Sequence, residues 1–283
     1  MQSGGLRTKG ITKTSTPEKT LITVVTVVYN GATTLEQTIQ SVVNQTYDNV
    51  EYIIIDGAST DASLDIIKKY EDKIDYWQSE PDKGIYDAMN KGCNNALGNY
   101  CIYLNCGDYF LTKDVLQKSS IYITGEDIIT GKEVLSNHTV VSGIQKNNLN
   151  LFSYMNSYLP HESTFIKTNF LKQHNYRIDY RIISDYVFFY EALFSYNVTY
   201  KTIPIKITFF NLDGISSKNR ELANKELENF FESALSKAVL DLYYKYGGNK
   251  GCLELCNYKF LLLGFKICRK IRRILKEKLN YYL

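Results

Sequence analysis

The sequence predicts an α/β fold, in which helices flank an open, mostly parallel, twisted sheet. Two apolar runs rich in β-branched residues, 21–28 and 51–55, are typical of strands that are buried on both faces of such a sheet. Apolar residues recur at helical spacing after each run, and a third apolar run at 100–104 continues the alternation of strand and helix. Polar residues follow each run directly, and ligands bind at that end of the strands in open α/β sheets.

The first two strands are each followed by a turn and a helix. The run 21–28 stops at Tyr29-Asn30-Gly31, and the apolar spacing that follows predicts a helix that includes Leu35 and Val43. The run 51–55 stops at residues 56–61, which are rich in turn-forming side chains. A helix through Leu64, Ile67 and Tyr70 comes next. Asp61 lies three residues before Leu64, where a cap at the start of that helix is its expected role.

A charged turn over residues 79–84 leads straight into another helix. Pro81, Asp82 and Gly84 are turn residues, and an apolar stripe follows at helical spacing. The stripe consists of Ile85, Ala88, Met89, Cys93 and Ala96. Taken alone, the segment is typical of a capped, solvated helix, although the free N–H groups of a helix start also favour an anion.

The second half of the chain is less regular. Short strands are expected at 127–130 and 134–135, and a polar interruption at 160–165 precedes another strand. A helix begins at Ser184, and alternation over 198–210 predicts a strand. A long helix is expected from about 220 to 246, and an amphipathic helix from about 257 to 279. The expected organisation is a flexible leader at 1–19, a main domain at 20–217 and a helical extension at 218–283.

Composition and charge narrow the class of protein. The 283 residues are 44% hydrophobic and 22% charged, as in an ordinary soluble globular protein. Residues 257–279 hold eight Lys and Arg against one Glu, whereas the rest of the chain is mildly acidic. This pattern disfavours nucleic-acid binding and predicts that the basic helix docks on an anionic membrane surface. Six cysteines without a C-x-x-C pair, and the lack of a signal-like or membrane-spanning apolar run, predict a cytoplasmic location.

Several common site motifs are missing from the sequence. There is no G-x-G-x-x-G after the first strand, no G-x-x-x-x-G-K-[ST] and no G-x-S-x-G. These absences disfavour a dinucleotide site, a phosphate-cradling ATPase loop and an esterase. The carboxylates and amides at the strand ends instead suit a nucleotide together with Mn²⁺ or Mg²⁺, which prefer oxygen ligands.

Four ordered segments resemble a known family. They are residues 27–30, 56–61, the charged turn, and 104–108. Together they resemble the family 2 glycosyltransferases, whose GT-A fold is Rossmann-like, and most of all the bacterial transferases for colanic acid, capsule and O-antigen. The resemblance is close over about 20–108 and looser up to 217. It implies inverting transfer of a hexosyl or N-acetylhexosaminyl group from a nucleotide sugar, expected to be a UDP sugar, to a hydroxyl of a saccharide or lipid-linked acceptor.

The resemblance also assigns donor-site residues. Val28, Tyr29 and Asn30 match the segment that lines the nucleotide pocket, and Asp56 matches the residue that contacts the base or ribose. Asp87 lies near the position that usually contacts the nucleotide or the diphosphate. Met89 stands where the family often has Arg, so that diphosphate contact is expected to differ.

Two further positions concern the metal. Asp108 matches the last carboxylate of the family's metal motif and is the expected ligand of Mn²⁺ or Mg²⁺. Asn105 stands at the first position of that motif and is placed with the nucleotide-binding residues. With a single carboxylate left, we expect either weaker metal binding or a further ligand from a later segment, such as His161.

The catalytic role falls to Asp185, which matches the family's base. Such a carboxylate takes the proton from the acceptor hydroxyl as that hydroxyl attacks the anomeric carbon. His161 is a candidate contact to the acceptor or the metal, and a structural histidine is an equal alternative. Residues 213–216 resemble a loop that closes over the donor in this family.

Two other functions remain open from the sequence. A sugar nucleotidylyltransferase would share the sheet, but it should carry a Gly-rich basic loop after the first strand, and residues 29–33 lack one. A catalytically silent sugar-binding or assembly subunit would fit the thinned metal motif. The helix expected at 220–246 could serve as the interface of a homodimer.

Overall fold

The structure is a computed structural model that describes residues 1–196, 198–212, 214 and 218–246. Its strands are β1 (Gln2–Gly4), β2 (Ile22–Val28), β3 (Val50–Asp56), β4 (Tyr76–Ser79), β5 (Tyr100–Tyr103), β6 (Tyr109–Phe110), β7 (Ile128–Leu135), β8 (Val140–Ser142), β9 (Thr164–Lys167) and β10 (Tyr200–Phe210). Its α-helices are α1 (Leu35–Val43), α2 (Ser63–Lys69), α3 (Ile85–Asn95), α4 (Val115–Ser120), α5 (Leu151–Met155), α6 (Thr168–Gln173), α7 (Ser184–Phe194), α9 (Arg220–Ala234) and α10 (Lys237–Tyr246).

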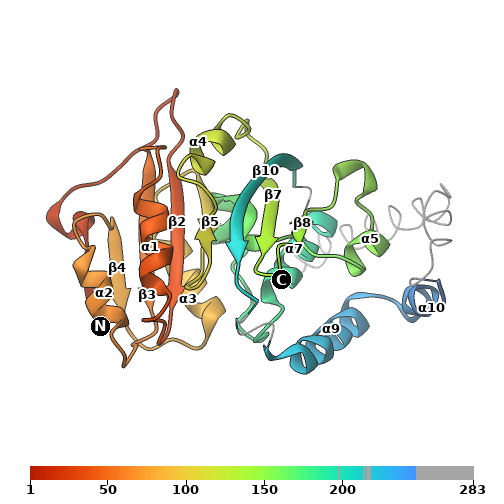
Figure 1. Cartoon of the computed structure of the whole chain (residues 1–283). Coiled ribbons are helices and arrows are strands. Elements are labelled where there is room, and N and C mark those ends of the chain that lie inside the picture. Colours follow the sequence, from red (N-terminus) through yellow and green to blue (C-terminus); the bar gives the residue numbers. More distant parts are fainter. Residues whose placement is uncertain (197, 213, 215–217, 247–283) are drawn as a thin grey trace, which may run out of the picture.

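In the described part of the chain, ten strands form one sheet in the order β1-β4-β3-β2-β5-β9-β7-β10-β6, and β8 pairs with β7 (Figure 1). The strands β4, β3, β2 and β5 are parallel, as are β7 and β10. Strand β9 is antiparallel to both of its neighbours, β5 and β7, and joins the two parallel parts. The α/β class is therefore confirmed, but the sheet is mixed, because antiparallel strands lie at its middle and at its edges.

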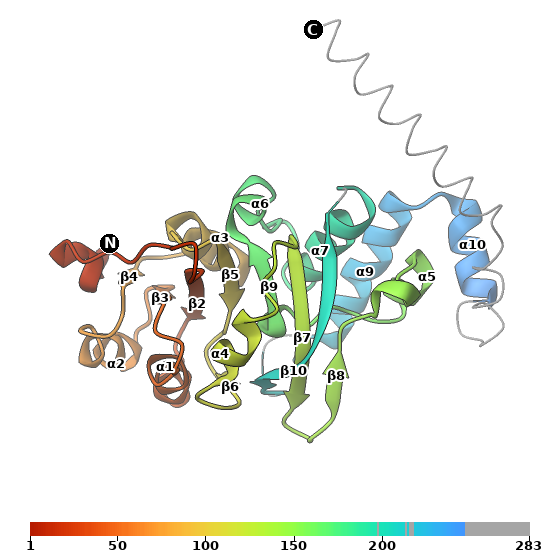
Figure 2. The same ribbon diagram turned by 90° about the horizontal axis from the view of Figure 1, so that it is seen from above.

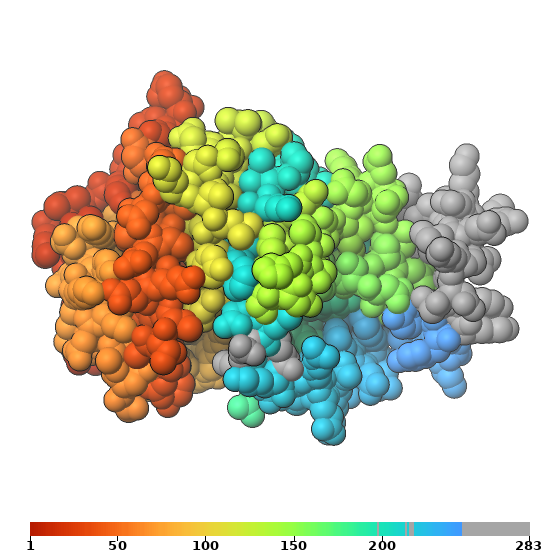
Figure 3. Space-filling view, viewed as in Figure 1, coloured from red at the N-terminus to blue at the C-terminus, as the bar shows by residue number. Residues whose placement is uncertain are grey.

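Helices cover both faces of the sheet (Figure 2). The helices α1, α2 and α4 lie on one face, where they share a buried apolar cluster with β2 and β3. The helices α3, α6 and α7 pack on the other face around a second cluster. In the space-filling view, the orange α1–α2 region, the yellow segment and the green and cyan segments form one continuous surface (Figure 3). Apolar residues are buried on both faces of the sheet, and a third cluster joins α7 to α9 and α10.

One glycine lets the helix α3 pack directly against the sheet. Its apolar stripe is buried as predicted, with Ala88 and Met89 at 2% and 0% exposure. At Gly92, an added Cβ would collide with the side chain of Val25 on β2. A larger side chain at Gly92 would therefore push α3 away from β2.

The first residues of the chain do not form the flexible leader that their composition predicted. Strand β1 pairs antiparallel with β4 and so covers one edge of the sheet. The Arg7 side chain donates to the carbonyl of Asn95 at 2.7 Å, and Lys13 Nζ lies 2.8 Å from the buried carboxylate of Asp75. Edge pairing and these long-range contacts hold the segment, and neither can be read from local composition.

The helix predicted over 220–246 is two helices, α9 and α10. Leu235 is extended, with ψ at 150°, and the carbonyl of Ser236 accepts from the N–H groups of Val239 and Leu240. This break lets Phe230 and Leu240 join one apolar cluster with residues of α7. Residues 247–283, including the predicted basic helix, lie outside the described part. Within the part that is described, no helix is long and apolar enough to cross a membrane.

Candidate active site

The loops after β2 and β3 are locked together at the carboxyl ends of the strands. Asn30 has a left-handed backbone with φ at 52°, and its Oδ1 accepts from the N–H of Thr60 at 2.8 Å. The N–H of Asn30 donates to Ser59 Oγ at 2.8 Å. Val28 is buried at the end of β2, whereas Tyr29 is 67% exposed. Asn30 therefore holds the loop in shape, and the ring of Tyr29 is exposed to solvent at the strand end.

Asp56 is a fully buried carboxylate at the end of β3. Its Oδ2 accepts from Ser79 Oγ at 2.6 Å and from the N–H of Ser59 at 3.1 Å. Its Oδ1 is buried and has no hydrogen-bond partner among the described residues. An unpartnered buried oxygen of this kind is costly, so Asp56 is a strong acceptor for a ligand's N–H or O–H.

The charged turn lies beside these strand ends, as the α/β alternation predicts. The N–H of Glu80 donates to the carbonyl of Asp56 at 3.1 Å, and Asp82 lies against Gly57. Asp87, however, is used inside its own turn: its Oδ2 accepts from the N–H of Lys83 at 3.0 Å and lies 3.5 Å from Lys91 Nζ. The turn is therefore in the expected place, with the Asp87 carboxylate already partnered.

Met89 points into the core instead of towards a ligand. Its side chain is fully buried and packs in the cluster between α3 and the sheet. Met89 therefore does not make the diphosphate contact that an Arg at this position would make.

Asp108 is buried behind the loop that follows β5. Its Oδ1 accepts from the N–H of Asn211 at 3.0 Å, and its carbonyl accepts from Thr38 Oγ1 at 2.7 Å. Burial and the nearby carboxylate of Glu162 raise the pKa of Asp108 well above its usual range. Within the described ranges, no three His, Cys, Asp or Glu side chains come together as a metal-binding group. Asp108 is thus a single carboxylate, which suits a cation only if a ligand supplies most of the oxygens.

Asp185 lies in the first turn of α7 and is held through both carboxylate oxygens. Its Oδ2 lies 3.0 Å from Nδ1 of His161, and its Oδ1 accepts from the hydroxyl of Tyr86 at 2.7 Å. The Asp185 side chain is 20% exposed, so it remains open to an incoming group. Burial works to raise the pKa of Asp185, but the contacts with His161 and Tyr86 outweigh it and hold that pKa below the usual range.

His161 has protein partners at both ring nitrogens. Its Nε2 lies 2.9 Å from Glu162 Oε1 and 3.1 Å from Nδ2 of Asn105. Burial acts to lower the pKa of His161, but Glu162 and Asp185 together raise it well above its usual value. Because a carboxylate oxygen lies within 3.0 Å of each ring nitrogen, the arrangement favours the cationic imidazole, which offers no free nitrogen to a metal. A structural role beside Asp185 fits His161 better than the predicted metal contact.

Two buried glutamates extend this network. Glu133 on β7 and Glu162 are 1% and 2% exposed, and Glu133 Oε1 accepts from the hydroxyl of Tyr158 at 2.5 Å. Burial, followed by the charge of Glu162, raises the pKa of Glu133 to about 8. One positive imidazole thus lies among several carboxyl groups. Repulsion between their negative charges makes it unfavourable for all of them to be ionised at once.

The site therefore joins segments that are far apart in the sequence. His161 pairs with Asp185 and lies against the side chain of Asn105, whereas Asp56 belongs to the β3 end beside the charged turn. Sequence reasoning missed three members of the site: Tyr86, Glu133 and Glu162. Tyr86 interrupts the apolar stripe of α3 with a hydroxyl, which was its one local signal. Nothing local marks Glu133 or Glu162 as buried.

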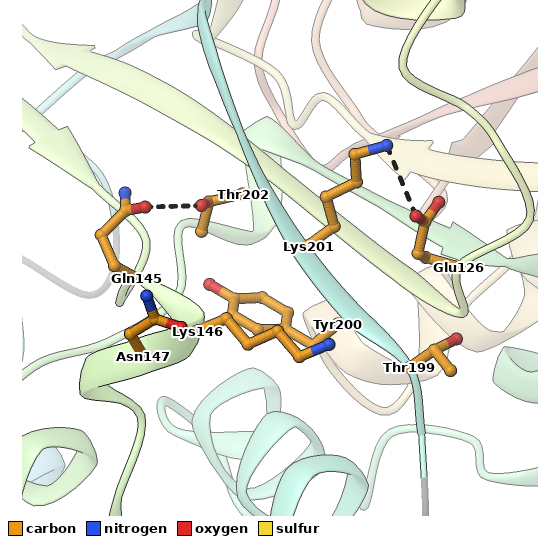
Figure 4. A pocket seen from close by; sticks show the side chains of 8 residues that line it. All are labelled: Glu126, Gln145, Lys146, Asn147, Thr199, Tyr200, Lys201 and Thr202. Carbon is orange, nitrogen blue, oxygen red and sulfur yellow. Dashed lines mark hydrogen bonds and ion pairs between the residues drawn. The ribbon is translucent and has the colours of Figure 1, made fainter.

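A hollow of about 520 Å³ lies elsewhere, at the start of β10 (Figure 4). It is lined by Glu126, Gln145, Lys146, Asn147, Thr199, Tyr200, Lys201 and Thr202. Lys201 and Glu126 pair at 3.4 Å, and Thr202 donates to Gln145 at 2.9 Å. None of the predicted site residues lines it, and it lies at the amino-terminal ends of the parallel strands β7 and β10. This hollow is therefore separate from the candidate site.

The chain is similar to known glycosyltransferases. An uncharacterized glycosyltransferase of Mycobacterium tuberculosis is 29% identical over 81% of this chain and 87% of its own length. The Escherichia coli protein named UDP-Glc:alpha-D-GlcNAc-diphosphoundecaprenol beta-1,3-glucosyltransferase WfaP is 32% identical over 39% of this chain and 50% of its own. Residues 1–349 of Staphylococcus aureus TarS, solved with UDP-GlcNAc, match with a TM-score of 0.60 at 16% identity, over 81% of this chain and 74% of that one.

The structural likeness concerns the fold, and it agrees with the GT-A architecture expected from the sequence. The family model described as Glycosyl transferase family 2 matches residues 23–189, a range that includes all but the first residue of β2, the charged turn, His161 and Asp185. Because this match covers more than half of the chain, the protein belongs to glycosyl transferase family 2.

Proposed function

We propose that the protein is an inverting glycosyltransferase that moves a sugar from a UDP sugar to an acceptor hydroxyl, with Asp185 as the base. The arrangement around Asp185 carries this proposal: a partly exposed carboxylate is kept charged by a cationic imidazole, at the edge of the sheet where ligands bind. His161 lies between Asp185 and the Asn105 side chain, which follows β5, and Asp56 ends β3 two strands away. A base and a nucleoside contact on one sheet edge suit transfer from a nucleotide sugar.

The chemistry at Asp185 is a single displacement. An Asp185 oxygen accepts the proton of the acceptor hydroxyl as the hydroxyl oxygen bonds to the anomeric carbon, and the bond from that carbon to the diphosphate oxygen breaks. The acceptor attacks the face opposite the diphosphate, so the anomeric configuration inverts. His161 supports this role because its positive charge keeps Asp185 in the proton-accepting form.

A divalent cation fits the site only if the donor's diphosphate supplies most of the oxygens that bind it. Asp108 would hold Mn²⁺ or Mg²⁺ together with the donor's diphosphate oxygens, and the ion would offset charge on the departing diphosphate. The chain itself contributes the buried Asp108 carboxylate to this cation site, and the N–H of Asn211 holds that carboxylate in place.

The proposed classes of donor and acceptor come from what the names of related proteins say that those proteins use. WfaP is named for a UDP-Glc donor and a diphosphoundecaprenol-linked acceptor, and TarS is solved with UDP-GlcNAc. We extend these classes to this chain: a UDP sugar, a saccharide or lipid-linked acceptor, and a place in bacterial surface polysaccharide synthesis such as capsule formation. Docking of the basic segment 257–279 on an anionic membrane surface completes the proposal, since it would bring the site to a lipid-linked acceptor.

The test is a panel of nucleotide sugars incubated with the full chain and Mn²⁺ or Mg²⁺, with release of the nucleoside diphosphate as the readout. We expect turnover with at least one UDP sugar and tight binding of UDP by calorimetry. Binding of UDP without turnover of any donor would favour the silent-subunit alternative. Release of pyrophosphate from UTP and a sugar phosphate would favour the nucleotidylyltransferase, which membership of family 2 already disfavours.

A further inference from the structure

The hydroxyl of Tyr86 faces two acceptors with a single hydrogen. It lies 2.7 Å from Asp185 Oδ1 and 2.6 Å from the carbonyl oxygen of Ile182. A tyrosine hydroxyl donates one hydrogen and can also accept. Only one of the two acceptors can therefore receive the hydrogen at any moment, although both lie at hydrogen-bonding distance.

The position of this hydroxyl is set by rigid parts of the fold. Tyr86 lies in the first turn of α3, is 6% exposed, and packs against Tyr176 with 5.6 Å between the ring centroids. On the other side, the N–H of Ile182 donates to Glu226 of α9 at 3.0 Å, which fixes the backbone just before α7. The two acceptors and the hydroxyl are thus held by different elements, so their close approach is a property of the tertiary fold.

We propose that Tyr86 is a positioning residue for Asp185 whose hydrogen bond reverses when Asp185 takes up a proton. This inference rests on the proposed role of Asp185 as the base. While Asp185 is charged, the Tyr86 hydroxyl donates to Oδ1. After the acceptor's proton has moved to Asp185, the Oδ1–H group donates to the Tyr86 oxygen, and the Tyr86 hydrogen turns to the carbonyl of Ile182. One proton has moved from the acceptor to Asp185, and Tyr86 gains and loses none.

The reversal leaves Asp185 partnered in both protonation states. A buried polar group that loses its partner is costly, so a partner that only donates would oppose protonation of Asp185. His161 is such a partner, because its cationic ring donates to Oδ2 and accepts nothing. Tyr86 can supply what His161 cannot, an acceptor for the proton that the reaction delivers.

The first test is Tyr86→Phe in the full chain, assayed with the UDP sugar that the panel identifies. We expect kcat to fall about 10-fold or more, while the KM for the donor and the Kd for UDP stay within about 2-fold. Tyr176→Phe is the matched control, because the Tyr176 hydroxyl is buried in the same aromatic cluster and has no partner within the described part of the chain. That variant should keep the wild-type kcat. Equal kcat values for Tyr86→Phe and wild type would overturn the proposal.

A double-mutant cycle separates this inference from the proposed function. In an Asp185→Asn background, Tyr86→Phe should lower the residual rate no further, because its effect acts through Asp185. A purely structural role would lower the rate in both backgrounds and would contradict the proposal. If Asp185→Asn itself keeps the wild-type rate, the proposed function fails; if it is inactive while Tyr86→Phe is fully active, only the role of Tyr86 fails.

A second variant covers the case in which Tyr86→Phe does not fold. With p-aminophenylalanine in place of Tyr86, the amino group can donate to Asp185 and Ile182 at once, but it is a poor acceptor. We expect a folded protein that binds UDP normally and has a kcat at least several-fold lower. A wild-type kcat in that variant would show that reversal of the hydrogen bond is not needed.

Discussion

Nδ1 of His161 lies 3.0 Å from Oδ2 of Asp185, which places a cationic ring against the carboxylate at the start of α7. The opposite ring nitrogen lies 2.9 Å from Glu162, so the positive charge sits between two negative ones. The pair explains how a half-buried aspartate keeps a low pKa even though burial favours its neutral form. A carboxylate that stays charged and is still partly exposed is suited to accept a proton.

The free oxygen of Asp56 predicts a loss of nucleotide affinity when its charge is removed. Asp56→Asn should weaken UDP binding about 10-fold or more, because a hydrogen bond to a charged group is worth about 1.5–3 kcal/mol. Titration calorimetry with UDP measures this change. Ser79→Ala is the control, since it removes a partner of Oδ2 and leaves the unpartnered Oδ1 in place. Equal affinities for Asp56→Asn and wild type would remove Asp56 from the nucleotide site.

The close approach of α3 to β2 predicts a stability effect at Gly92. Gly92→Ala should lower the free energy of unfolding by about 1–3 kcal/mol, because the added methyl group collides with Val25. Urea unfolding followed by circular dichroism measures the change. Asn94→Ala is the matched control on the exposed side of the same helix and should stay within about 0.5 kcal/mol of wild type. A neutral Gly92→Ala would mean that α3 can move away from β2 at little cost.

The raised pKa of Glu133 predicts how the free energy of unfolding depends on pH. Its pKa in the folded protein is about 8, above the ordinary value of 4.5, so folding favours the protonated form. The stabilising contribution of that form is complete below the ordinary pKa and is lost as the pH rises through about 8. The wild type should therefore lose stability relative to Glu133→Gln between pH 6 and pH 9. The measurement is the difference between the two urea midpoints at each pH, and the same difference at both values would contradict the prediction.

Local patterns predicted the part of the fold that depends on local sequence. The β-branched runs predicted β2 and β3, and the stripe through Ala88 and Met89 predicted α3. The polar residues after the runs lie at the carboxyl ends of those strands. These features follow from burial on both faces of a parallel strand and from the helical period, which are visible in short windows. The α/β class was therefore predictable.

Pairings between distant segments were not predictable in this way. Strand β9 is antiparallel between β5 and β7, and the segment that was expected to be a leader pairs with β4. Likewise, Glu133 and Glu162 become buried neighbours of the site only through the tertiary fold, and the hydroxyl of Tyr86 was only a weak local signal within α3. The chemistry of Asp185 came from the family resemblance, whereas its partners His161 and Tyr86 came from the structure.

The most direct measurement of the central claim is the transfer rate of Asp185→Asn beside that of Asp179→Asn. Asp179 has a 59% exposed side chain paired with Arg177, and it serves as a nearby control. With the donor found by the panel, Asp185→Asn should lower kcat at least about 100-fold and keep the wild-type Kd for UDP, while Asp179→Asn stays within about 2-fold. Equal rates for Asp185→Asn and wild type would contradict the assignment of Asp185 as the base.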